Sequence, residues 1–565
     1  MFINLLNWSW ILFTTYILGY TVINTNLRRH KCVDVIISAG FVIATVYAEV
    51  FSIFYKVGLL ASLMLLGIVI MLFILQRKSI VLSLEKAIDA LKQVKNWKKV
   101  ICIVLIIFFL FNSARYPISW DDFLYHAQAL RWIEEYGLVK GLGNLHERFA
   151  FNSAFLCLQA LFGWSFAPFV HDSLHTINSL GSLLFTLYCI LTMSPINNWN
   201  NIKSSDILKG LGLLYIAENI NSIIGIETDI LCILFVQYIF IKWVELDEND
   251  ERPRELYAFL AIIALYTCTL KLSAVMLCLL TIYPLIKFVK DKDIIGIFGA
   301  FLACIIIVAP FIARNILLSG YLVFPYEQLD ILNVKWKVPI NIVEDTINGI
   351  VIWGKSTQAA MKIDAAGVVR DYPLQKWFPY WFSGINLFYK LCFVAAVSAI
   401  IIHIFYVLYK VTKKKQIPDH EFVTLVAIAG FIFWFLQAPA LRFGSVFMWI
   451  TIALVSTDVL SAVRCANAVL LFMCCGVVAI FGIHRLRQVD FKDVNIVASK
   501  GYYYDVEYDE YSIDGQHVIY VPVEGDRADY QHFPETPSKK IASNIKLLGK
   551  GFSGGFYMGS DKNPE

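Results

Sequence analysis

The apolar run VICIVLIIFFLF at residues 100–111 passes directly into NSARYPISWDDFLYHAQALRWIEEYGLVKGLGNLHERFAFNS at residues 112–153. This second stretch carries an acidic pair, two histidines, several arginines and a Gly-x-Gly turn. The chain as a whole is 58% hydrophobic and 16% charged, so the cluster of polar residues requires an explanation. Ionisable groups at the edge of a membrane are costly unless they face a cavity or a partner, and the stretch therefore indicates a site.

The composition is that of a membrane protein. The 565 residues have a mean hydropathy of +0.63, and 15% of them are aromatic. Many apolar runs reach about twenty residues, enough to cross about 30 Å of hydrocarbon as helices. We predict an all-α polytopic membrane protein with about fourteen transmembrane helices. The expected spans are 5–23, 33–55, 57–76, 99–113, 174–193, 207–225, 229–245, 256–271, 273–289, 293–312, 386–409, 422–438, 444–460 and 466–483.

A further apolar stretch, Ala154 to Val170, is interrupted by Gly163, Trp164 and Pro168. It can be read as another span or as a re-entrant or interfacial helix. The second interpretation keeps the charges of the connecting loops consistent, because the basic loops then all fall on one face of the membrane. That face should be cytoplasmic, which places both termini and residues 112–153 outside. The N-terminal run lacks the basic start and cleavage site of a secretory signal and is expected to be a retained first span.

Three regions are expected. Residues 1–98 should hold N-terminal spans and an amphipathic helix, Arg77 to Lys99, on the cytoplasmic leaflet, although a solvated linker is the alternative. Residues 99–483 should form the transmembrane core, with long external loops at 113–173 and 315–385. Residues 484–565 should form a small extracytoplasmic α/β or β domain, since HVIYVPV is typical of a strand.

Several classes of function are disfavoured. A net charge of +4 is too small to suggest a nucleic-acid partner. The 12 cysteines lie mostly in apolar runs and form no C-x-x-C pair, which argues against a disulfide framework or a zinc site. The sequence contains no P-loop and no Rossmann fingerprint, so nucleotide-driven chemistry in the cytoplasm is not expected.

The acidic pair in SWDDFLYHAQALRWIEEYG offers the first candidate site residues. Ser119 and Asp122 have the spacing of a capping box, which predicts that a helix begins here and lies on the membrane surface with Trp132 and Tyr136 as anchors. Asp122 and His126 are four residues apart and should share one face. Asp121, near the start of the helix, should stay ionised and can serve as a general base or a metal ligand. Capping alone would also explain either aspartate, and Asp122 more readily than Asp121.

The end of the stretch, GLVKGLGNLHERFAFNS, adds a second group of candidates. Its glycines permit tight turns close to a ligand. Asn144, His146 and Arg148 are candidates for binding phosphate or sugar hydroxyls. A solvated loop is an equal explanation for His146.

Other ionisable residues are expected at the same face. Glu227 and Asp229 lie in a short turn between two apolar spans, and Lys271, Arg314 and Arg442 lie at the ends of others. Each alone is typical of a snorkelling residue. Several together, with both signs of charge, favour a binding cavity.

The motif WDDFLYHAQALRWIEEYGLVKGLGNLHERFAFNS, together with ETDI, TLKLSA and PALRFG, resembles the GT-C fold glycosyltransferases. It is most similar to a bacterial family of GT-C-like envelope proteins whose activities are mostly undefined. The resemblance covers roughly residues 100 to 480. It implies an integral enzyme of the bacterial inner membrane, with its active site facing the periplasm or exterior. Such an enzyme takes a sugar from a polyprenyl-phosphate or polyprenyl-diphosphate donor and passes it to a glycan, lipid or protein acceptor.

The resemblance also implies roles for particular residues. Asp121 becomes the general base that deprotonates the acceptor. Asp122, Glu227 and Asp229 would orient that base, and Asp121, Asp122 and Asp229 would hold a divalent cation such as Mg²⁺ or Mn²⁺ if one is used. Lys271, Arg314 and Arg442 would bind the donor phosphate, where charge develops in the transition state.

Two readings from other classes remain open at this stage. One is a non-catalytic transporter or flippase for lipid-linked glycans, which internal symmetry and mid-bilayer charges would favour. The other is a scaffold of a polysaccharide assembly complex, with residues 484–565 as its docking module.

Overall fold

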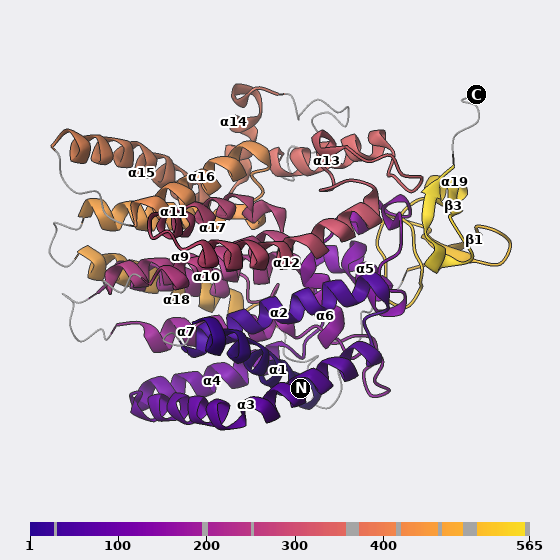
Figure 1. Cartoon of the computed structure of the whole chain (residues 1–565). Coiled ribbons are helices and arrows are strands. Elements are labelled where there is room, and N and C mark those ends of the chain that lie inside the picture. The colour runs from indigo at the N-terminus through magenta and orange to yellow at the C-terminus, as the bar shows by residue number, and fades with distance from the viewer. Residues whose placement is uncertain are drawn as a thin grey trace.

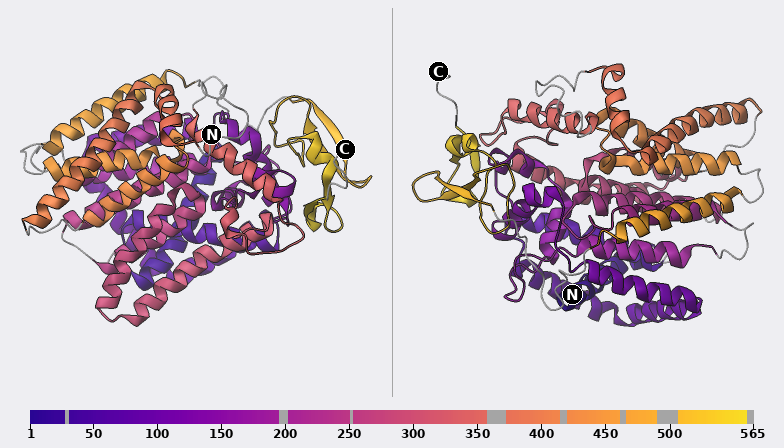
Figure 2. Two further views of the ribbon diagram at one scale, coloured as in Figure 1. Left: turned by 90° about the horizontal axis from the view of Figure 1, so that it is seen from above. Right: turned by 180° about the vertical axis from the view of Figure 1, so that it is seen from behind.

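The computed structural model describes residues 1–27, 31–194, 202–249, 253–356, 372–413, 420–460, 466–489 and 506–559. Most of the long helices run along a common direction, and the C-terminal strands lie beyond one end of the bundle beside α5 (Figures 1 and 2). We call this the module end of the bundle. The chain is thus a helical bundle with a small strand-containing module, residues 506–559, at one end.

In the first half of the chain, every described element of regular structure is a helix. Its elements are α1 (Phe2–Asn26), α2 (Val33–Phe54), α3 (Leu59–Gln93), α4 (Asn96–Asn112), η1 (Asp122–His126), α5 (Ala127–Glu135), η2 (Leu142–Asn144), η3 (Glu147–Ala150), α6 (Ala154–Phe162), α7 (Ile177–Thr192), α8 (Ser204–Glu218), α9 (Thr228–Glu248) and α10 (Arg254–Leu270).

The second half continues the bundle and then forms the strands. Its elements are η5 (Leu272–Thr281), α11 (Ile282–Lys290), α12 (Ile294–Ser319), η6 (Glu327–Leu329), α13 (Ile340–Lys355), α14 (Leu374–Gly384), α15 (Leu387–Thr412), α16 (Glu421–Gln437), α17 (Leu441–Val459), α18 (Ala466–Leu486), β1 (Tyr508–Ser512), β2 (Val518–Pro522), α19 (Lys539–Asn544), β3 (Ile545–Leu547), η8 (Phe552–Gly554) and β4 (Phe556–Met558).

Each expected span coincides with a helix of the bundle, but fewer of them are long enough to cross a membrane alone. In the described part of the chain, eight helices have the required length and composition: α1, α2, α3, η5 with α11, α12, α15, α17 and α18. The helices α4, α7, α8, α10 and α16 have 15 to 17 residues. At 1.5 Å per residue they extend only about 22–26 Å, less than about 30 Å of hydrocarbon. The architecture is therefore that of a polytopic helical membrane protein, with eight clear candidate spans.

The interrupted stretch Ala154 to Val170 forms only the nine-residue helix α6. A helix of that length extends about 14 Å and cannot cross a bilayer. All of its residues are buried, and it packs against α2 and α5. The helical part of the stretch is therefore a short internal helix, too short to be a span and enclosed by protein instead of lying at the interface, and the structure leaves a re-entrant position untested.

The predicted amphipathic helix is not a separate element. Residues 77–93 continue α3 without a break, so α3 runs for 35 residues. The chain leaves the helix only at Val94, and α4 begins at Asn96. The basic segment after Arg77 thus extends a membrane helix beyond its apolar part.

The two ends of α12 show how the local sequence determines where a helix of the bundle begins and ends. Asp293 caps the N-terminus, where its side chain accepts a hydrogen bond of 2.8 Å from the backbone of Gly296. At the other end Gly320 has a φ of 86°, a left-handed conformation that ends the helix. A Cβ at Gly320 would also lie 2.8 Å from the backbone of Lys337. The chain can therefore turn back over the module end only with glycine at this position.

The module consists of two antiparallel pairs, β1 with β2 and β3 with β4. The predicted strand in HVIYVPV is β2, in which Ile519 and Val521 are buried. Fully buried and half-buried residues alternate from Val518 to Val521, which gives the module its small apolar face. The first residues expected in this domain, His484 to Leu486, still belong to α18.

Candidate functional site

The acidic motif begins its helix with a π-turn, η1, which continues as α5. Asp122 is fully buried at the first position of this turn. One of its oxygens lies 3.1 Å from Nδ1 of His126, and the other accepts a hydrogen bond of 3.2 Å from the backbone N–H of Ile226. The prediction that Asp122 and His126 share a face is therefore confirmed.

The predicted capping box is wrong. No side chain caps the start of the helix, and the Ser119 hydroxyl donates to Glu227. The reason is the wider π-turn, in which the Asp122 carboxylate turns to the loop between α8 and α9. Asp122 therefore has a role other than capping the helix. Its carboxylate fixes the turn that carries Glu227 and leads into Asp229.

That turn depends on a glycine. A Cβ on Gly225 would lie 2.0 Å from Oδ2 of Asp122, so only glycine permits this approach. The amide of Asn178, on α7, donates to the carbonyl oxygens of Gly225 and Glu227 at 2.9 and 2.8 Å. The loop between α8 and α9 is thus held from two sides.

Among the carboxyl groups of the site, Glu227 is the one whose ionised form its surroundings disfavour. Burial raises its pKa above the usual range, and the negative charges of Asp229 and Asp122 raise it further. Only 8% of Glu227 is exposed, and its described hydrogen-bond donor is Ser119. The side chain can therefore hold a proton close to neutral pH, unlike an exposed glutamate.

Two ion pairs close the outer side of the site. Arg442 Nη1 lies 2.7 Å from Oδ2 of Asp121, and Lys271 pairs with Asp229. Both cations lie over the ring of Phe443, with Lys271 Nζ 4.6 Å and the Arg442 guanidinium 5.1 Å from its centroid. Both cations stand at helix breaks, since Lys271 is extended between α10 and η5 and Arg442 precedes a kink in α17. The breaks turn these charges toward the module end.

The kink in α17 is at Gly444. A Cβ there would lie 2.6 Å from the ring of Trp434, so a larger residue would push α17 away from α16. The Trp434 indole also donates 2.8 Å to the carbonyl oxygen of Ala440. This packing places Arg442 beside the start of η1.

The site has a closed base and an open rim. Asp122 and His126 are buried at the base, whereas the Arg442 side chain is 40% exposed at the rim. Burial alone would raise the pKa of Asp121, but the charge of Arg442, with His126 and Lys271 further away, lowers it below the usual value. Asp121 is therefore an ionised carboxylate at the rim, and the cause is the charge of Arg442 instead of the expected start of the helix. We call Asp121, Asp122, His126, Glu227, Asp229, Lys271 and Arg442 the rim cluster.

The residues of the glycine-rich turn divide between two roles. Asn144 donates to the carbonyl oxygens of Gly141 and Trp336, at 3.1 and 2.9 Å, and so holds the loop after α12. His146 lies 3.1 Å from Glu147 and is buried. Arg148 lies 5.8 Å from the ring centre of Tyr125, a residue of η1. The His146 ring also lies 6.5 Å from that of Tyr125, so His146 and Arg148 both reach the neighbourhood of the rim cluster, whereas Asn144 holds the loop.

Arg314 lies elsewhere. It is buried, donates 3.0 Å to Asn152 and also contacts Ser52 on α2. It lines a small cavity with Trp132, Phe149 and Asn152. The structure therefore does not bring Arg314 together with Lys271 and Arg442.

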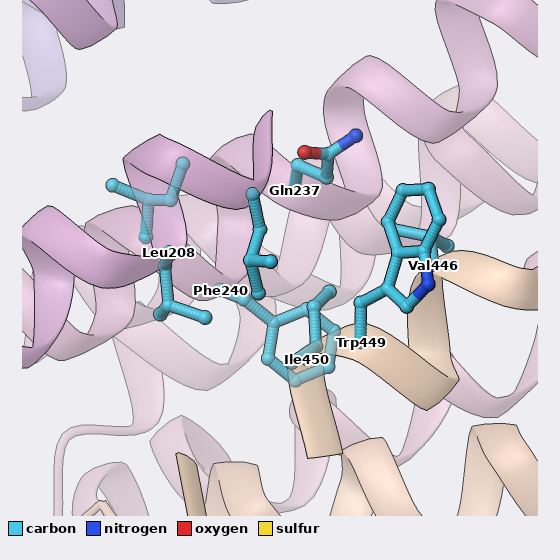
Figure 3. A pocket seen from close by; sticks show the side chains of 8 residues that line it. Leu208, Gln237, Phe240, Val446, Trp449 and Ile450 are labelled. Carbon is cyan, nitrogen blue, oxygen red and sulfur yellow. The ribbon is translucent and has the colours of Figure 1, made fainter. Parts of the chain in front are cut away.

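A second small cavity lies between α8, α9 and α17 (Figure 3). Figure 3 shows that its labelled lining is apolar except for the Gln237 amide and the indole nitrogen of Trp449. It holds no charged side chain and lies apart from the rim cluster in the packing of the helices, so it adds no group to the site.

Helix α5 is covered by the module and is not a membrane-surface helix as expected. Trp132, expected as an anchor in the membrane interface, is fully buried against Phe533, Phe552 and Phe556. The physical reason is a competing partner: the module supplies an aromatic surface that encloses the indole ring more completely than a bilayer interface.

Polar contacts fix the module on α5. The Gln128 amide donates to the carbonyl oxygens of Asp529 and His532 at 2.6 and 2.7 Å. Arg131 donates to the carbonyl oxygen of Gln531 at 2.8 Å and stacks on Phe533 at 4.8 Å. These residues were not among the sequence candidates, although the strong polar face of ALRWIEE was a signal for a partner.

Glu134 completes this interface. Its two oxygens accept hydrogen bonds from Ser173, at 2.8 Å, and from the Tyr530 hydroxyl, at 2.5 Å. Burial raises the pKa of Glu134 to about 8, although both hydrogen bonds act in the opposite direction. The contact between α5 and the module thus contains a carboxyl group that is protonated at neutral pH.

The three aspartates considered as cation ligands do not converge. Asp121 pairs with Arg442, Asp229 pairs with Lys271, and Asp122 contacts His126 and Ile226. Within the described ranges, the group of side chains spaced to hold a metal ion is a different one, His403, Glu421 and Asp458. The residues of the rim cluster, as they stand, do not fit a divalent cation.

The fold and the site together define a polytopic membrane protein with an ionised, partly open polar cluster at one end. The chain belongs to a family described as a domain of unknown function, DUF8201, which matches residues 1–449. The match includes every residue of the rim cluster and stops inside α17. No curated protein and no solved structure matches the chain.

Proposed function

We propose that this protein is a membrane glycosyltransferase of the GT-C type, with its site on the extracytoplasmic face of a bacterial inner membrane. It would transfer a sugar from a polyprenyl-phosphate or polyprenyl-diphosphate donor to a glycan, lipid or protein acceptor. The observation that carries the proposal is the Asp121–Arg442 ion pair at the open rim of the site. The pair supplies one group that accepts a proton and one that binds a phosphate.

The proposed reaction divides these tasks between the two residues. The acceptor hydroxyl oxygen attacks the anomeric carbon of the donor, and its proton passes to Asp121. The bond between that carbon and the phosphate oxygen breaks, and the leaving phosphate keeps the electron pair. Arg442, assisted by Lys271, stabilises the negative charge of that phosphate. No step uses a cation, since the carboxylates near the reacting groups are each bound to a different protein partner.

A lowered pKa makes Asp121 a weak base while it is paired with Arg442. A donor phosphate that binds Arg442 would draw the guanidinium away from the carboxylate. The pKa of Asp121 would then rise, because the neighbouring positive charge that lowers it is shared with the phosphate. Binding of the donor and activation of the base are coupled in this proposal.

The position of the site suits a donor with a lipid tail. Trp120 directly precedes Asp121 and Ile118 lies two residues before Trp120, and the exposed fractions of Ile118 and Trp120 are 59% and 57%. Exposed apolar side chains beside a charged rim can contact an isoprenoid chain while the phosphate meets Arg442. Arg527 of the module lies 3.3 Å from the ring centre of Trp120, so the module borders the same entrance.

The first test separates recognition of phosphate from recognition of lipid. We expect the purified full-length protein to bind undecaprenyl phosphate more tightly than undecaprenol, by at least about tenfold, because a charge-assisted contact is worth about 1.5–3 kcal/mol. Binding can be measured by native mass spectrometry or by the shift in Tm. Equal binding of the two lipids would contradict the role of Arg442.

The second test concerns transfer. Asp121→Asn should keep the binding of undecaprenyl phosphate and lower the rate of transfer from polyprenyl-phosphate-linked hexoses and pentoses by about 100-fold or more. Asp89→Asn is the matched control, since Asp89 pairs with Lys92 on the exposed face of α3, 2.8 Å away. Normal turnover in the Asp121 variant would remove it from the mechanism. Tight binding of the lipid without any transfer by the wild type would instead support the non-catalytic transporter.

A further inference from the structure

A second polar cluster lies where three helices of the C-terminal half meet. It consists of His403 from α15, Glu421 from the first position of α16 and Asp458 near the end of α17. One ligand atom from each side chain lies within 4.8 Å of the others. The exposed fractions of the three residues are 2%, 8% and 6%.

This cluster stands far from the rim cluster. Asp458 follows Arg442 by sixteen residues along α17, which corresponds to about 24 Å of helix. It therefore lies toward the other end of the bundle from the module. Nothing in the proposed glycosyl transfer uses these three side chains.

The side chains of His403 and Glu421 lack the partners that buried polar groups usually have. Nε2 of His403 lies 2.8 Å from Oε1 of Glu421. Neither ring nitrogen and neither glutamate oxygen, however, has a hydrogen bond of good geometry within the described residues. In the same part of the chain, no lysine or arginine lies within ion-pair distance of Glu421. A buried carboxylate and imidazole so arranged are costly inside a membrane protein, and each unsatisfied group of this kind needs an explanation.

A further histidine fixes the third member. The residue before Glu421, His420, is hydrogen-bonded through Nε2 to Oδ1 of Asp458. This contact orients the Asp458 carboxylate within the cluster. Carboxylates that bind metal ions are commonly oriented by such outer hydrogen bonds.

We propose that His403, Glu421 and Asp458 bind a divalent transition-metal ion, for which Zn²⁺ is the probe. One imidazole and two carboxylates form a mixed nitrogen and oxygen ligand set, which suits Zn²⁺ or Mn²⁺, whereas Mg²⁺ and Ca²⁺ take oxygen ligands. Two positive charges would balance the two carboxylates. The ion would also give His403 and Glu421 a common partner.

The ion would join three helices at one point. Glu421 starts α16, Asp458 lies one residue before the end of α17, and His403 lies in the last third of α15. A shared ion would fix their relative positions, much as a disulfide does. Since α17 also carries Arg442, the position of the rim cluster would depend in part on this distant ligand set.

The test is metal binding by the full-length protein in detergent. After dialysis against a chelator, Zn²⁺ is titrated in competition with a fluorescent chelator, and bound zinc is counted by plasma mass spectrometry. We expect one ion per chain for the wild type. His403→Gln and Glu421→Gln should each weaken binding by at least about 100-fold, because loss of a ligand exceeds the 10–100-fold effect of losing an outer partner. His517→Gln is the matched control, since His517 forms an exposed pair with Asp514, 2.8 Å away.

Two results would overturn the proposal: a wild type that binds no stoichiometric zinc, or ligand variants that bind zinc as the wild type does. If a ligand variant fails to fold, the proposal is tested by two measurements on the wild type. Co²⁺ in the same site should give visible absorption bands of a nitrogen and oxygen ligand set, and Zn²⁺ should raise the Tm of the wild type. Absence of both effects would show that His403 and Glu421 form only an ion pair.

Discussion

The two ends of α17 carry polar clusters of opposite character. At the module end, Arg442 and Lys271 stand beside Asp121 and Asp229, and the Arg442 side chain is 40% exposed. Toward the other end, Glu421 and His403 are enclosed by helices, and the described residues give Glu421 no lysine or arginine. A cluster that contains its own cations and opens outward is suited to exchange partners with a substrate. A closed cluster with excess negative charge is suited to hold one ion permanently.

The largest effect is expected from removing the exposed cation. Arg442→Gln should lower the rate of glycosyl transfer by about 100- to 1,000-fold, because the charge on the leaving phosphate would lose its principal partner. The change in Tm should be small, since the guanidinium is partly solvated. Transfer from a polyprenyl-phosphate sugar and thermal unfolding are the two measurements.

Arg254→Gln provides the comparison for that experiment. Arg254 pairs with Asp291 and Asp293 at 2.9 and 2.6 Å, away from the rim cluster. An equal loss of transfer in both variants would mean that transfer depends on any paired arginine and not on Arg442 in particular. The difference in function between the two ends of α17 would then be contradicted.

The second-largest effect is expected at the closed cluster, which consists of His403, Glu421 and Asp458. His420→Gln should weaken Zn²⁺ binding about 10- to 100-fold while leaving one ion per chain, because His420 orients Asp458 without binding the ion. Competition titration measures this change. His171→Gln, which alters another histidine–aspartate pair at 2.9 Å, should leave zinc binding unchanged. Complete loss of stoichiometric zinc in the His420 variant would make it a ligand and would revise the cluster.

A third experiment tests the rigid base of the rim cluster. Gly225→Ala brings a methyl carbon to 2.0 Å from Oδ2 of Asp122, so the carboxylate or the turn between α8 and α9 must shift. We expect a loss of about 1–3 kcal/mol in the free energy of unfolding. Transfer should fall as well, because Glu227 and Asp229 move with the turn.

Gly299→Ala is the control for that change. Gly299 lies within α12, and an added Cβ meets no atom within 4 Å. Alanine should be neutral or slightly stabilising there, since it favours helix over glycine. Two variants with the same unfolding free energy would show that the approach of Asp122 to the loop is not required.

The smallest effect is a dependence on pH. The pKa of Glu134, about 8 in the folded protein, is raised from its ordinary value of 4.5. The proton that Glu134 keeps stabilises docking of the module fully at low pH, and this contribution is lost as the pH rises from about 4.5 through 8. The Tm should therefore fall more over this range in the wild type than in Glu134→Gln. Glu135→Gln, with a half-exposed neighbouring carboxylate, should behave as the wild type.

Much of the fold follows from the sequence because membrane helices are set by local composition. Apolar runs predicted the long helices, and the break at Lys271 and the short Ala154 stretch were visible as interruptions. The number of helices that cross the membrane was harder to predict from the sequence. Helices such as α8, with 15 residues, are apolar enough to pack inside the bundle but too short to cross alone. Composition does not separate burial in protein from burial in lipid.

The site was predictable in part. Acidic and basic residues at helix ends indicated one polar region, and the structure brings Asp121, Asp229, Lys271 and Arg442 to it. Arg314 binds Asn152, which belongs to the same polar stretch, and Ser52 of α2, whose contact with Arg314 the sequence gives no reason to expect.

The closed cluster of His403, Glu421 and Asp458 was not predicted from the sequence, again because its members come from segments far apart in the chain. Its members come from three helices, and the one local signal was a histidine, His403, inside an apolar run. Such a residue is a functional candidate by itself, but its partners are set by the packing of helices.

The contact between α5 and the module has a consequence for biosynthesis. Gln128 and Asp529, which are hydrogen-bonded, are 401 residues apart in the chain. At roughly 5–20 residues per second, the ribosome needs about 20–80 s to deliver the module after α5 has emerged. During that interval Trp132 and the polar face of α5 have no partner from the module. The nascent chain therefore needs either the lipid interface or a chaperone to cover α5 until the last part of the protein is made.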